Sequence, residues 1–276
     1  MNALVFDIGG TNLRIALTDG KKIGKPILVP APRSFAGVTE TLARSGKIMA
    51  GNNKINAVAG GLAGPLDTNK SSLARSTHLK YLVGKPMKQT LERVFDAHIV
   101  LENDNALAGI GEATHGAGKG YSIMAYIGIG TGIGGCRIID GKLDRNAQGF
   151  EPGHHFINYD VQRHKHQSAH PGDWESLVSG TGMEVRFGRR AETIRDKIIW
   201  DEMAYLTALG LINVAMFWSP DIIVVGGSMM KSIPLARIRY YADKHQKIFP
   251  QMPPIVRATL GDFGGLYGAM ELARRL

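Results

Sequence analysis

Two segments, one in each half of the chain, share a pattern in which an apolar run, a glycine-rich turn and a second apolar run follow one another. The first spans Val5 to Leu17 and turns at Gly9-Gly10-Thr11, and the second spans Ser122 to Ile139 and turns between Gly128 and Gly135. Each pattern predicts a β-hairpin. Two copies of one hairpin predict a duplicated α/β domain, in which each copy contributes one turn to a shared ligand.

Glycine turns of this kind suit phosphate binding, because backbone N–H groups can approach an anion where no Cβ intervenes. In the first turn the side chains of Thr11 and Asn12 can donate hydrogen bonds as well. The turn is not a P-loop, since no Gly-Lys-Ser/Thr sequence follows it. Either turn alone is also compatible with a plain hairpin, but the presence of two favours a nucleotide held by both.

The length of 276 residues allows a substantial core and predicts two domains. A hydrophobic content of 44 % and a charged content of 21 % are ordinary for a globular protein. The single cysteine, Cys136, excludes an intramolecular disulfide and favours a reducing compartment. The apolar start of the chain is too short for a signal peptide, and no apolar run approaches the roughly 18 residues of a membrane span. We therefore expect a cytoplasmic protein with no membrane partner.

The formal net charge of +9 can attract nucleic acid, anionic lipid or anionic small molecules. The basic residues are scattered, and the densest groups, Arg186 to Arg190 and Arg274-Arg275, lack the interleaved aromatic side chains of a surface that stacks on bases. We predict a solvated basic surface and no nucleic-acid partner. A phosphorylated substrate would also benefit from this charge.

Apolar periodicity and turn residues predict the order of elements along the chain. The first hundred residues are expected to form three strands, a helix, a strand, a helix and a strand. In the second half, a long helix follows the hairpin, and residues 221–229 predict a strand, a glycine turn at Gly226-Gly227 and the start of a helix. The other predicted elements are strands at 3–6, 13–17, 27–29, 57–62, 99–101, 122–127 and 136–139, helices at 38–50, 201–218 and 264–276, and the end of a helix at 91–95.

The stretch from Ile99 to Gly109 begins as an apolar strand, passes through Glu102-Asn103-Asp104-Asn105 and continues into small and apolar residues typical of a helix. Asp104 at this junction is a natural N-cap, because its side-chain oxygen can accept from unpaired backbone N–H groups. A carboxylate that lies between two phosphate-binding turns in the sequence could instead be a general base. The sequence leaves both interpretations open.

Five of the nine histidines lie between positions 154 and 170, in a polar stretch that follows Gly149-Phe150-Glu151-Pro152-Gly153. Histidines at such spacing can bind zinc or another transition metal, but an exposed polar loop is the simpler interpretation because no thiolate is nearby. Glu175 is expected early in a helix, where a glutamate often only complements the helix dipole. The glycines Gly226 and Gly227 could bind an anion or admit a flat ring, or could simply join a strand to a helix.

Taken together, these motifs resemble the ROK and bacterial glucokinase group of sugar kinases, within the actin-hexokinase fold. The resemblance covers nearly the whole chain. It implies an α/β, duplicated ribonuclease H-like fold with two domains around a nucleotide and sugar cleft. The smaller domain would comprise residues 1–113 and 264–276, and the larger one residues 114–263. The motifs that carry it are Asp7 to Asn12, Glu102-Asn103-Asp104, Gly128 to Gly134, Glu151-Pro152-Gly153-His154, Glu175 with Ser179-Gly180, and Val225-Gly226-Gly227.

The resemblance implies a role for each matching residue. Asp104 would be the general base that takes the proton from the sugar hydroxyl attacking the γ-phosphate of ATP, and Asn103 would hold the sugar. Glu151, His154 and Glu175 would hydrogen-bond sugar hydroxyls. Asp7 would lie near Mg²⁺, and Gly226 and Gly227 would pass close to the adenosine. The first phosphate-binding turn would consist of Gly9, Gly10, Thr11 and Asn12, and the second of Gly130, Thr131 and Gly132.

Two departures from the family pattern matter. Many ROK proteins bind zinc through the histidine of Glu-x-Gly-His and three cysteines just downstream, whereas the matching positions here fall near His166, Ser168 and Asp173. We therefore expect no zinc site of the family type. In Ser76-Thr77-His78-Leu79, His78 stands where many members carry an asparagine near the sugar, so His78 is a candidate sugar-binding residue that leaves the identity of the sugar open.

The favoured function is an ATP-dependent hexose kinase, with the 6-hydroxyl of glucose as the favoured acceptor. N-acetylmannosamine, N-acetylglucosamine and fructose are alternative acceptors, and polyphosphate is an alternative donor. A non-catalytic sugar-sensing regulator is a further alternative. It is disfavoured by the intact Asp104 and phosphate turns and by the lack of an N-terminal helix-turn-helix. The family resemblance also implies a homodimer.

Overall fold

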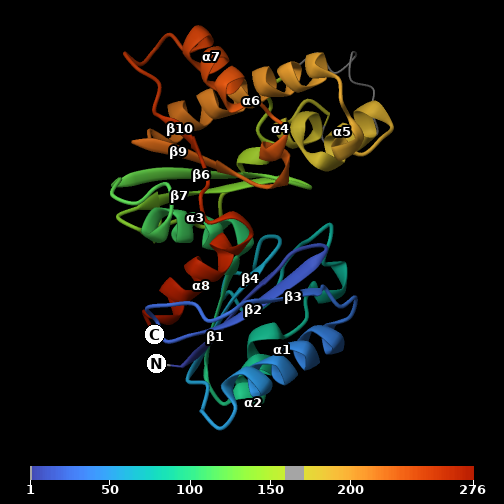
Figure 1. The fold of residues 1–276 in the computed structure, drawn as a ribbon, viewed down its shortest axis with the longest axis vertical. Helices are drawn as coiled ribbons and strands as arrows, with labels where there is room; N and C mark the ends of the chain where they lie inside the picture. Colours follow the sequence, from blue (N-terminus) through green and yellow to red (C-terminus); the bar gives the residue numbers. More distant parts are fainter. Residues whose placement is uncertain (1, 159–170) are drawn as a thin grey trace. The chain divides into compact units, whose positions relative to one another are not determined.

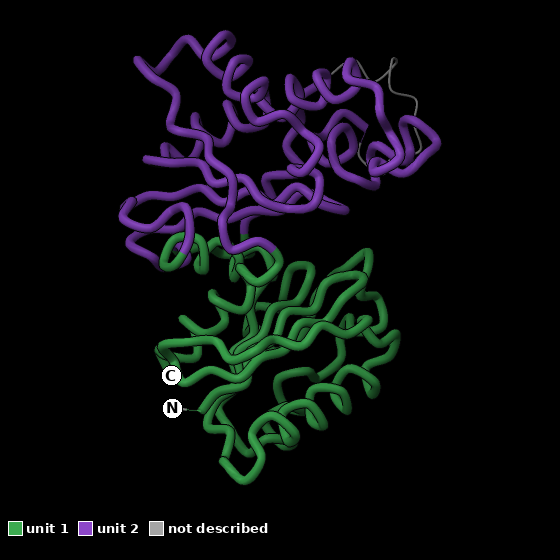
Figure 2. The backbone as a smooth tube through the Cα atoms, in the orientation of Figure 1, with its two compact units in different colours: residues 1–115, 145–149, 262–276 green, residues 116–144, 150–261 purple. Residues whose placement is uncertain are grey.

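The chain folds as two units, each built on one five-stranded sheet (Figure 1, Figure 2). The computed structural model describes residues 2–158 and 171–276. Unit 1 comprises residues 1–115, 145–149 and 262–276, and unit 2 comprises residues 116–144 and 150–261. The sequence-based boundaries at 113/114 and 263/264 lie within two residues of these divisions, but they placed residues 145–149 in the other domain.

In unit 1 the sheet has the strand order β3-β2-β1-β4-β5. Strands β1, β2 and β3 form an antiparallel meander, whereas β4 and β5 run parallel to β1. Helices α1 and α2 cover one face of this sheet, and α3 and α8 cover the other (Figure 1). The elements are β1 (Ala3–Ile8), β2 (Asn12–Thr18), β3 (Ile27–Pro30), α1 (Phe35–Ala50), β4 (Ala57–Leu62), η1 (Lys80–Leu82), α2 (Met87–Phe95), β5 (His98–Asn103), α3 (Asp104–His115) and α8 (Gly264–Ala273).

Small residues let the layers of unit 1 approach closely. A Cβ on Gly60 of β4 would lie 2.0 Å from the ring of Phe6, so the glycine makes room for that core side chain. At the crossing of α3 and α8, a Cβ on Gly268 would lie 1.9 Å from the carbonyl oxygen of Leu107. Since real Cβ contacts are never this short, both glycines are required by packing.

In unit 2 the sheet has the order β10-β9-β6-β7-β8, which repeats the arrangement of unit 1. Strand β6 pairs with β7 as an antiparallel hairpin and with β9 in parallel, just as β1 pairs with β2 and β4. The predicted duplication is therefore confirmed. The elements are β6 (Ile123–Ile129), β7 (Ile133–Ile139), β8 (Lys142–Leu143), η2 (Pro152–His154), α4 (Trp174–Val178), α5 (Gly180–Phe187), η3 (Ala191–Thr193), α6 (Lys197–Trp218), β9 (Ile222–Gly226), η4 (Ser228–Lys231), α7 (Leu235–His245) and β10 (Ile255–Arg257). The short η5 (Gly261–Phe263) begins with the last residue of unit 2 and continues into unit 1.

Several predicted boundaries are wrong, although the predicted order of the first hundred residues is confirmed. The second glycine turn is shorter than expected, because β6 continues to Ile129 and β7 begins at Ile133. Helix α6 begins at Lys197, four residues before the prediction, because Asp196 caps it by accepting from the backbone N–H of Ile198. After Gly227 the chain forms only the short η4, and α7 begins at Leu235 after Pro234.

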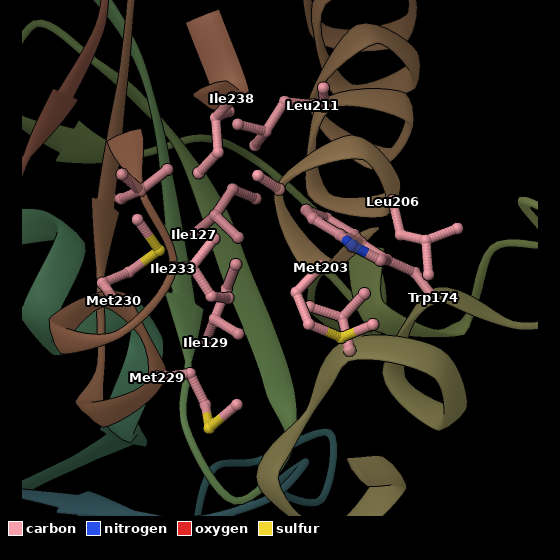
Figure 3. Packing of buried hydrophobic residues seen from close by; sticks show 14 of the residues in the cluster. Ile127, Ile129, Trp174, Met203, Leu206, Leu211, Met229, Met230, Ile233 and Ile238 are labelled. Atoms are coloured by element: carbon pink, nitrogen blue, oxygen red, sulfur yellow. The ribbon is translucent and has the colours of Figure 1, made fainter. Parts of the chain in front are cut away.

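The core of unit 2 packs helix α6 and the tryptophan of α4 against the sheet (Figure 3). Trp174 is fully buried, and a Cβ on Gly210 of α6 would lie 2.3 Å from its indole ring. Met203, Leu206 and Leu211 of α6 are buried in this core. By length and composition α6 could also cross a membrane, but 61 % of its most apolar window is buried inside the unit, which is typical of a core helix.

Candidate active site

The predicted general base, Asp104, is the first residue of α3 and follows directly after β5. The N-cap of this helix is Asn103 rather than Asp104, because Asn103 Oδ1 accepts from the backbone N–H groups of Asn105 at 3.0 Å and Ala106 at 3.1 Å. Asp104 Oδ1 accepts from the backbone and side-chain nitrogens of Asn105, at 2.9 and 3.1 Å. The capping interpretation of Asp104 is therefore wrong, and its carboxylate is available for other chemistry.

A second carboxylate shapes the electrostatics of Asp104. Two effects raise the pKa of Asp104 to about 7: burial of the carboxyl group, which is the larger effect, and the negative charge of Asp7. Burial also raises the pKa of Asp7 to about 6, although the guanidinium of Arg14, 3.6 Å away, lowers it. Two neighbouring carboxylates resist simultaneous ionisation. A pKa near 7 suits a general base, since it combines ionisation at neutral pH with useful basicity.

The first glycine turn begins at Gly9, directly after β1 and two residues after Asp7. The backbone N–H of Gly9 donates to the carbonyl of Asn12 at 3.0 Å, which closes the turn between β1 and β2. Gly10 lies against His78, since a Cβ on Gly10 would be 3.0 Å from the histidine Cβ. The structure thus places the exposed His78 beside the first glycine turn.

Asn103 is also fixed by groups that the sequence analysis did not identify. Its Nδ2 donates to the carbonyl oxygen of Gly64 at 3.1 Å, so one amide hydrogen remains for a ligand. Its backbone N–H donates to Glu102 Oε1 at 3.0 Å, and Lys70 forms an ion pair with the other oxygen of this buried carboxylate. No local pattern predicts the pairing of Lys70 with Glu102, because the two residues are far apart in the chain.

In unit 2, His154 is held by a carboxylate. Its Nδ1 lies 2.9 Å from Asp173 Oδ2, and Asp173 Oδ1 caps helix α4 by accepting from the backbone N–H of Ser176 at 2.8 Å. Burial lowers the pKa of His154, but the bond to Asp173 and the carboxylates of Glu175 and Glu151 outweigh this and raise it. The sequence analysis noted Asp173 only near a missing cysteine position, whereas the structure makes it the partner of His154.

Glu151 and Glu175 have different environments. Glu151 precedes η2 and is exposed, yet partial burial of its carboxyl group raises its pKa, with His154 opposing and Glu175 adding to the shift. Glu175 lies in the first turn of α4, as predicted, and its Oε2 accepts from the backbone N–H of Ile133 at 2.6 Å. It therefore lies against the second glycine turn, which the sequence treated as a separate motif.

The second glycine turn consists of Gly130, Thr131 and Gly132, closed by a bond from the N–H of Gly130 to the carbonyl of Gly132 at 2.8 Å. Gly227 lies next to it, at the end of β9, with a φ of 90°. A Cβ on Gly227 would lie 2.3 Å from the carbonyl oxygen of Ile129. Packing and backbone conformation thus already require glycine at position 227, whether or not a nucleotide passes it.

No three histidine, cysteine, aspartate or glutamate side chains within residues 2–158 and 171–276 are arranged to hold a metal ion. The remaining histidines of the cluster considered for metal binding, His164, His166 and His170, lie outside the described residues, as does Ser168. Of the five histidines in this cluster, the structure describes His154 and His155, so the predicted choice between a metal site and a polar loop stays open.

The duplicated sheets, with a glycine turn after each central strand, form an α/β fold that is similar to the structure of a ROK hexokinase from Thermus thermophilus, with a TM-score of 0.83 and 24 % identity over 99 % of this chain and 98 % of that one. A sequence model of the ROK family matches residues 3–276, and the chain belongs to this family.

Among its relatives, the glucokinase of Streptomyces coelicolor is 26 % identical over 97 % of this chain and 96 % of its own length. The fructokinase of Lactococcus lactis is 28 % identical over 82 % of this chain and 78 % of its own length. The structure of a ROK family glucokinase from Streptomyces griseus in complex with glucose and AMPPNP has a TM-score of 0.82 and 24 % identity, and all of both chains is covered.

Proposed function

We propose that the protein is an ATP-dependent sugar kinase that transfers the γ-phosphoryl group to a hexose, in the first place to the 6-hydroxyl of glucose. The observation that carries the proposal is Asp104, a carboxylate at the start of α3 whose pKa is raised to about 7 and which is not used as a helix cap. The glycine turns and the glucokinase and fructokinase relatives support the same class of reaction.

In this mechanism the ionised Asp104 accepts the proton of the attacking hydroxyl. The sugar oxygen forms a bond to the γ-phosphorus while the bond from that phosphorus to the bridging oxygen of ADP breaks, so the products are a sugar phosphate and ADP. Phosphoryl transfer depends mainly on positioning and on stabilising charge. Asp104 holds the hydroxyl in line, and the backbone N–H groups of the turns at Gly9–Asn12 and Gly130–Gly132 would hold the phosphates.

The residues around Asp7 fit a magnesium ion. Carboxylate oxygens are ligands that Mg²⁺ prefers, and Asp7 Oδ1 is buried without a hydrogen-bond donor among the described residues. Asp7 would hold the ion, directly or through water, and the bound ion would spread the negative charge of the phosphates. Arg14, which faces Asp7 across the β1–β2 pair, would keep this carboxyl ionised.

The sugar would be held by groups that match its ring of hydroxyls. Carboxylates accept hydrogen bonds from hydroxyl donors, which suits Glu151 and Glu175, and the remaining amide hydrogen of Asn103 can donate to a hydroxyl oxygen. His154 is oriented for this purpose by Asp173. His78, beside the first turn, would contact the sugar near the transferred phosphoryl group.

The test is an ADP-release assay with Mg²⁺ and ATP against glucose, mannose, fructose, N-acetylglucosamine and N-acetylmannosamine. We expect turnover with glucose, and we expect Asp104→Asn to reduce kcat by a factor on the order of 10³ while nucleotide binding persists. If only an N-acetylhexosamine or fructose is phosphorylated, the proposed mechanism stands and that sugar takes the place of glucose as the substrate. Near-normal activity of Asp104→Asn would refute the assignment of the base.

Two alternatives give different results in the same experiment. A polyphosphate donor, compatible with the charge of +9, would compete with ATP and support turnover without it. A non-catalytic regulator would bind sugar or duplex DNA without releasing ADP, and its DNA binding would weaken steeply with salt.

A further inference from the structure

Glu175 makes contacts that its proposed role in sugar binding does not require. Its Oε2 accepts from the backbone N–H of Ile133 at 2.6 Å, and a Cβ on Gly132 would lie only 2.5 Å from this oxygen. Glu151 provides a contrast within the same unit, because no side-chain hydrogen bond or ion pair joins it to another described residue. Of these two carboxylates, only Glu175 is therefore built into the second glycine turn.

The first residues of α5, which follows the helix of Glu175 in the chain, are bonded to the same turn. The N–H of Gly180 donates to the carbonyl of Gly130 at 2.8 Å, and the N–H of Thr181 donates to the carbonyl of Thr131 at 3.1 Å. Ser179, which joins α4 to α5 and is fully buried, donates its N–H to the carbonyl of Glu175 at 3.0 Å. Helix α4, the start of α5 and the glycine turn thus form one hydrogen-bonded structure.

Helix α4 has little freedom to adjust when a ligand binds. Trp174, the residue before Glu175, is fully buried against α6, and Asp173 caps the helix while holding His154. Because the backbone of α4 is held in place, a ligand that binds one oxygen of a carboxylate on this helix also restricts the position of the other oxygen and of the group bonded to it. For Glu175, that second group is the N–H of Ile133, which follows the turn directly.

We propose that Glu175 is a positioning residue that couples sugar binding to the second glycine turn. This inference rests on the proposed function, in which a sugar hydroxyl donates to Glu175 and the turn receives phosphates. The hydroxyl fixes the carboxylate, the carboxylate fixes the N–H of Ile133, and the turn from Gly130 to Gly132 is held in the shape that binds the nucleotide. Sugar then raises nucleotide affinity, and by reciprocity nucleotide raises sugar affinity by the same factor.

The test is isothermal titration of the full chain with AMPPNP and Mg²⁺, without sugar and with saturating glucose. For the wild type we expect glucose to tighten AMPPNP binding by about fivefold or more. Glu175→Ala should weaken AMPPNP binding several-fold without glucose and abolish the effect of glucose. Glu175→Gln keeps an oxygen that can accept from Ile133, so it should restore most of the glucose-free affinity for AMPPNP while still binding glucose weakly.

Glu151→Ala is the matched control, because it removes a carboxylate of the same unit that has no bond to the turn. It should weaken glucose binding, leave glucose-free AMPPNP affinity unchanged and retain the effect of saturating glucose. Equal glucose-free AMPPNP affinities for the wild type and a folded Glu175→Ala variant, checked by thermal unfolding, would overturn the inference. If glucose does not bind at all, the proposed substrate fails, but the glucose-free comparison of the two alanine variants still decides whether Glu175 positions the turn.

Discussion

At the scale of single residues, the proposed base Asp104 and its neighbour Asp7 predict the acid limb of the pH profile. A carboxylate base acts only when it is ionised, and the pKa of Asp104 is raised to about 7, so kcat/KM should rise with pH and level off above about 7. Asp7→Asn removes a negative charge that raises this pKa, so the limb should move to lower pH even though the activity remaining is small. The measurement is the pH profile of kcat/KM from pH 5 to 9. The midpoint pH of the acid limb can be determined from this profile even when the maximum value of kcat/KM is low.

Asp96→Asn is the control for this prediction, since it removes an exposed carboxylate at the end of α2 whose one ion pair with a described residue is that with Lys54. Its limb should coincide with that of the wild type. A limb that stays in place in Asp7→Asn would mean that Asp7 does not influence the ionisation of Asp104.

At the scale of the elements, the pair Lys70–Glu102 fixes the loop after β4 to the end of β5, beside Asn103. Lys70→Met would leave the buried carboxylate of Glu102 without its cation, which costs about 1–3 kcal/mol in the free energy of unfolding. It should also raise the KM for the sugar several-fold with a smaller change in kcat, because Asn103 loses part of its support. Chemical denaturation and steady-state kinetics measure the two effects.

The double variant Lys70→Met with Glu102→Gln should be less destabilised than Lys70→Met alone, because it removes the uncompensated charge as well. Lys54→Met is the matched control, since Lys54 and Asp96 form an exposed ion pair of little energetic value. A loss of stability in Lys54→Met as large as in Lys70→Met would show that the effect is not specific to the buried carboxylate.

Elements that depend on local pattern could be predicted from the sequence, whereas contacts between distant segments could not. The hairpins, the strand before Asp104 and the helix at Glu175 follow from apolar periodicity and glycine. The cap at Asn103 was missed by one residue, because asparagine and aspartate cap equally well and both stand at the junction. The partners Asp173 for His154 and Ile133 for Glu175 belong to segments that only the fold brings together.

At the scale of the whole molecule, the duplication gives both units a glycine turn directly after the central strand of the sheet. In unit 1 the central strand β1 leads into the turn at Gly9–Asn12, and in unit 2 the central strand β6 leads into the turn at Gly130–Gly132. Both central strands lie in the middle of their sheets, where neighbours on each side fix the backbone. Each turn thus follows a strand that is paired on both sides, which would preorganise the turn for the anion binding that we propose.

The net charge of +9 belongs to the whole chain and predicts how salt affects the two substrates differently. A positive field raises the association rate of MgATP, which is anionic, and has no such effect on a neutral sugar. Raising KCl from about 0.05 to 0.5 M shortens the screening length severalfold, so kcat/KM for MgATP should fall on the order of tenfold while kcat/KM for glucose, at saturating MgATP, changes little. Neutral glucose is the internal control, measured with the same enzyme and the same salt series. Equal salt dependence for both substrates would mean that the excess charge acts on the stability or closure of the protein rather than on nucleotide capture.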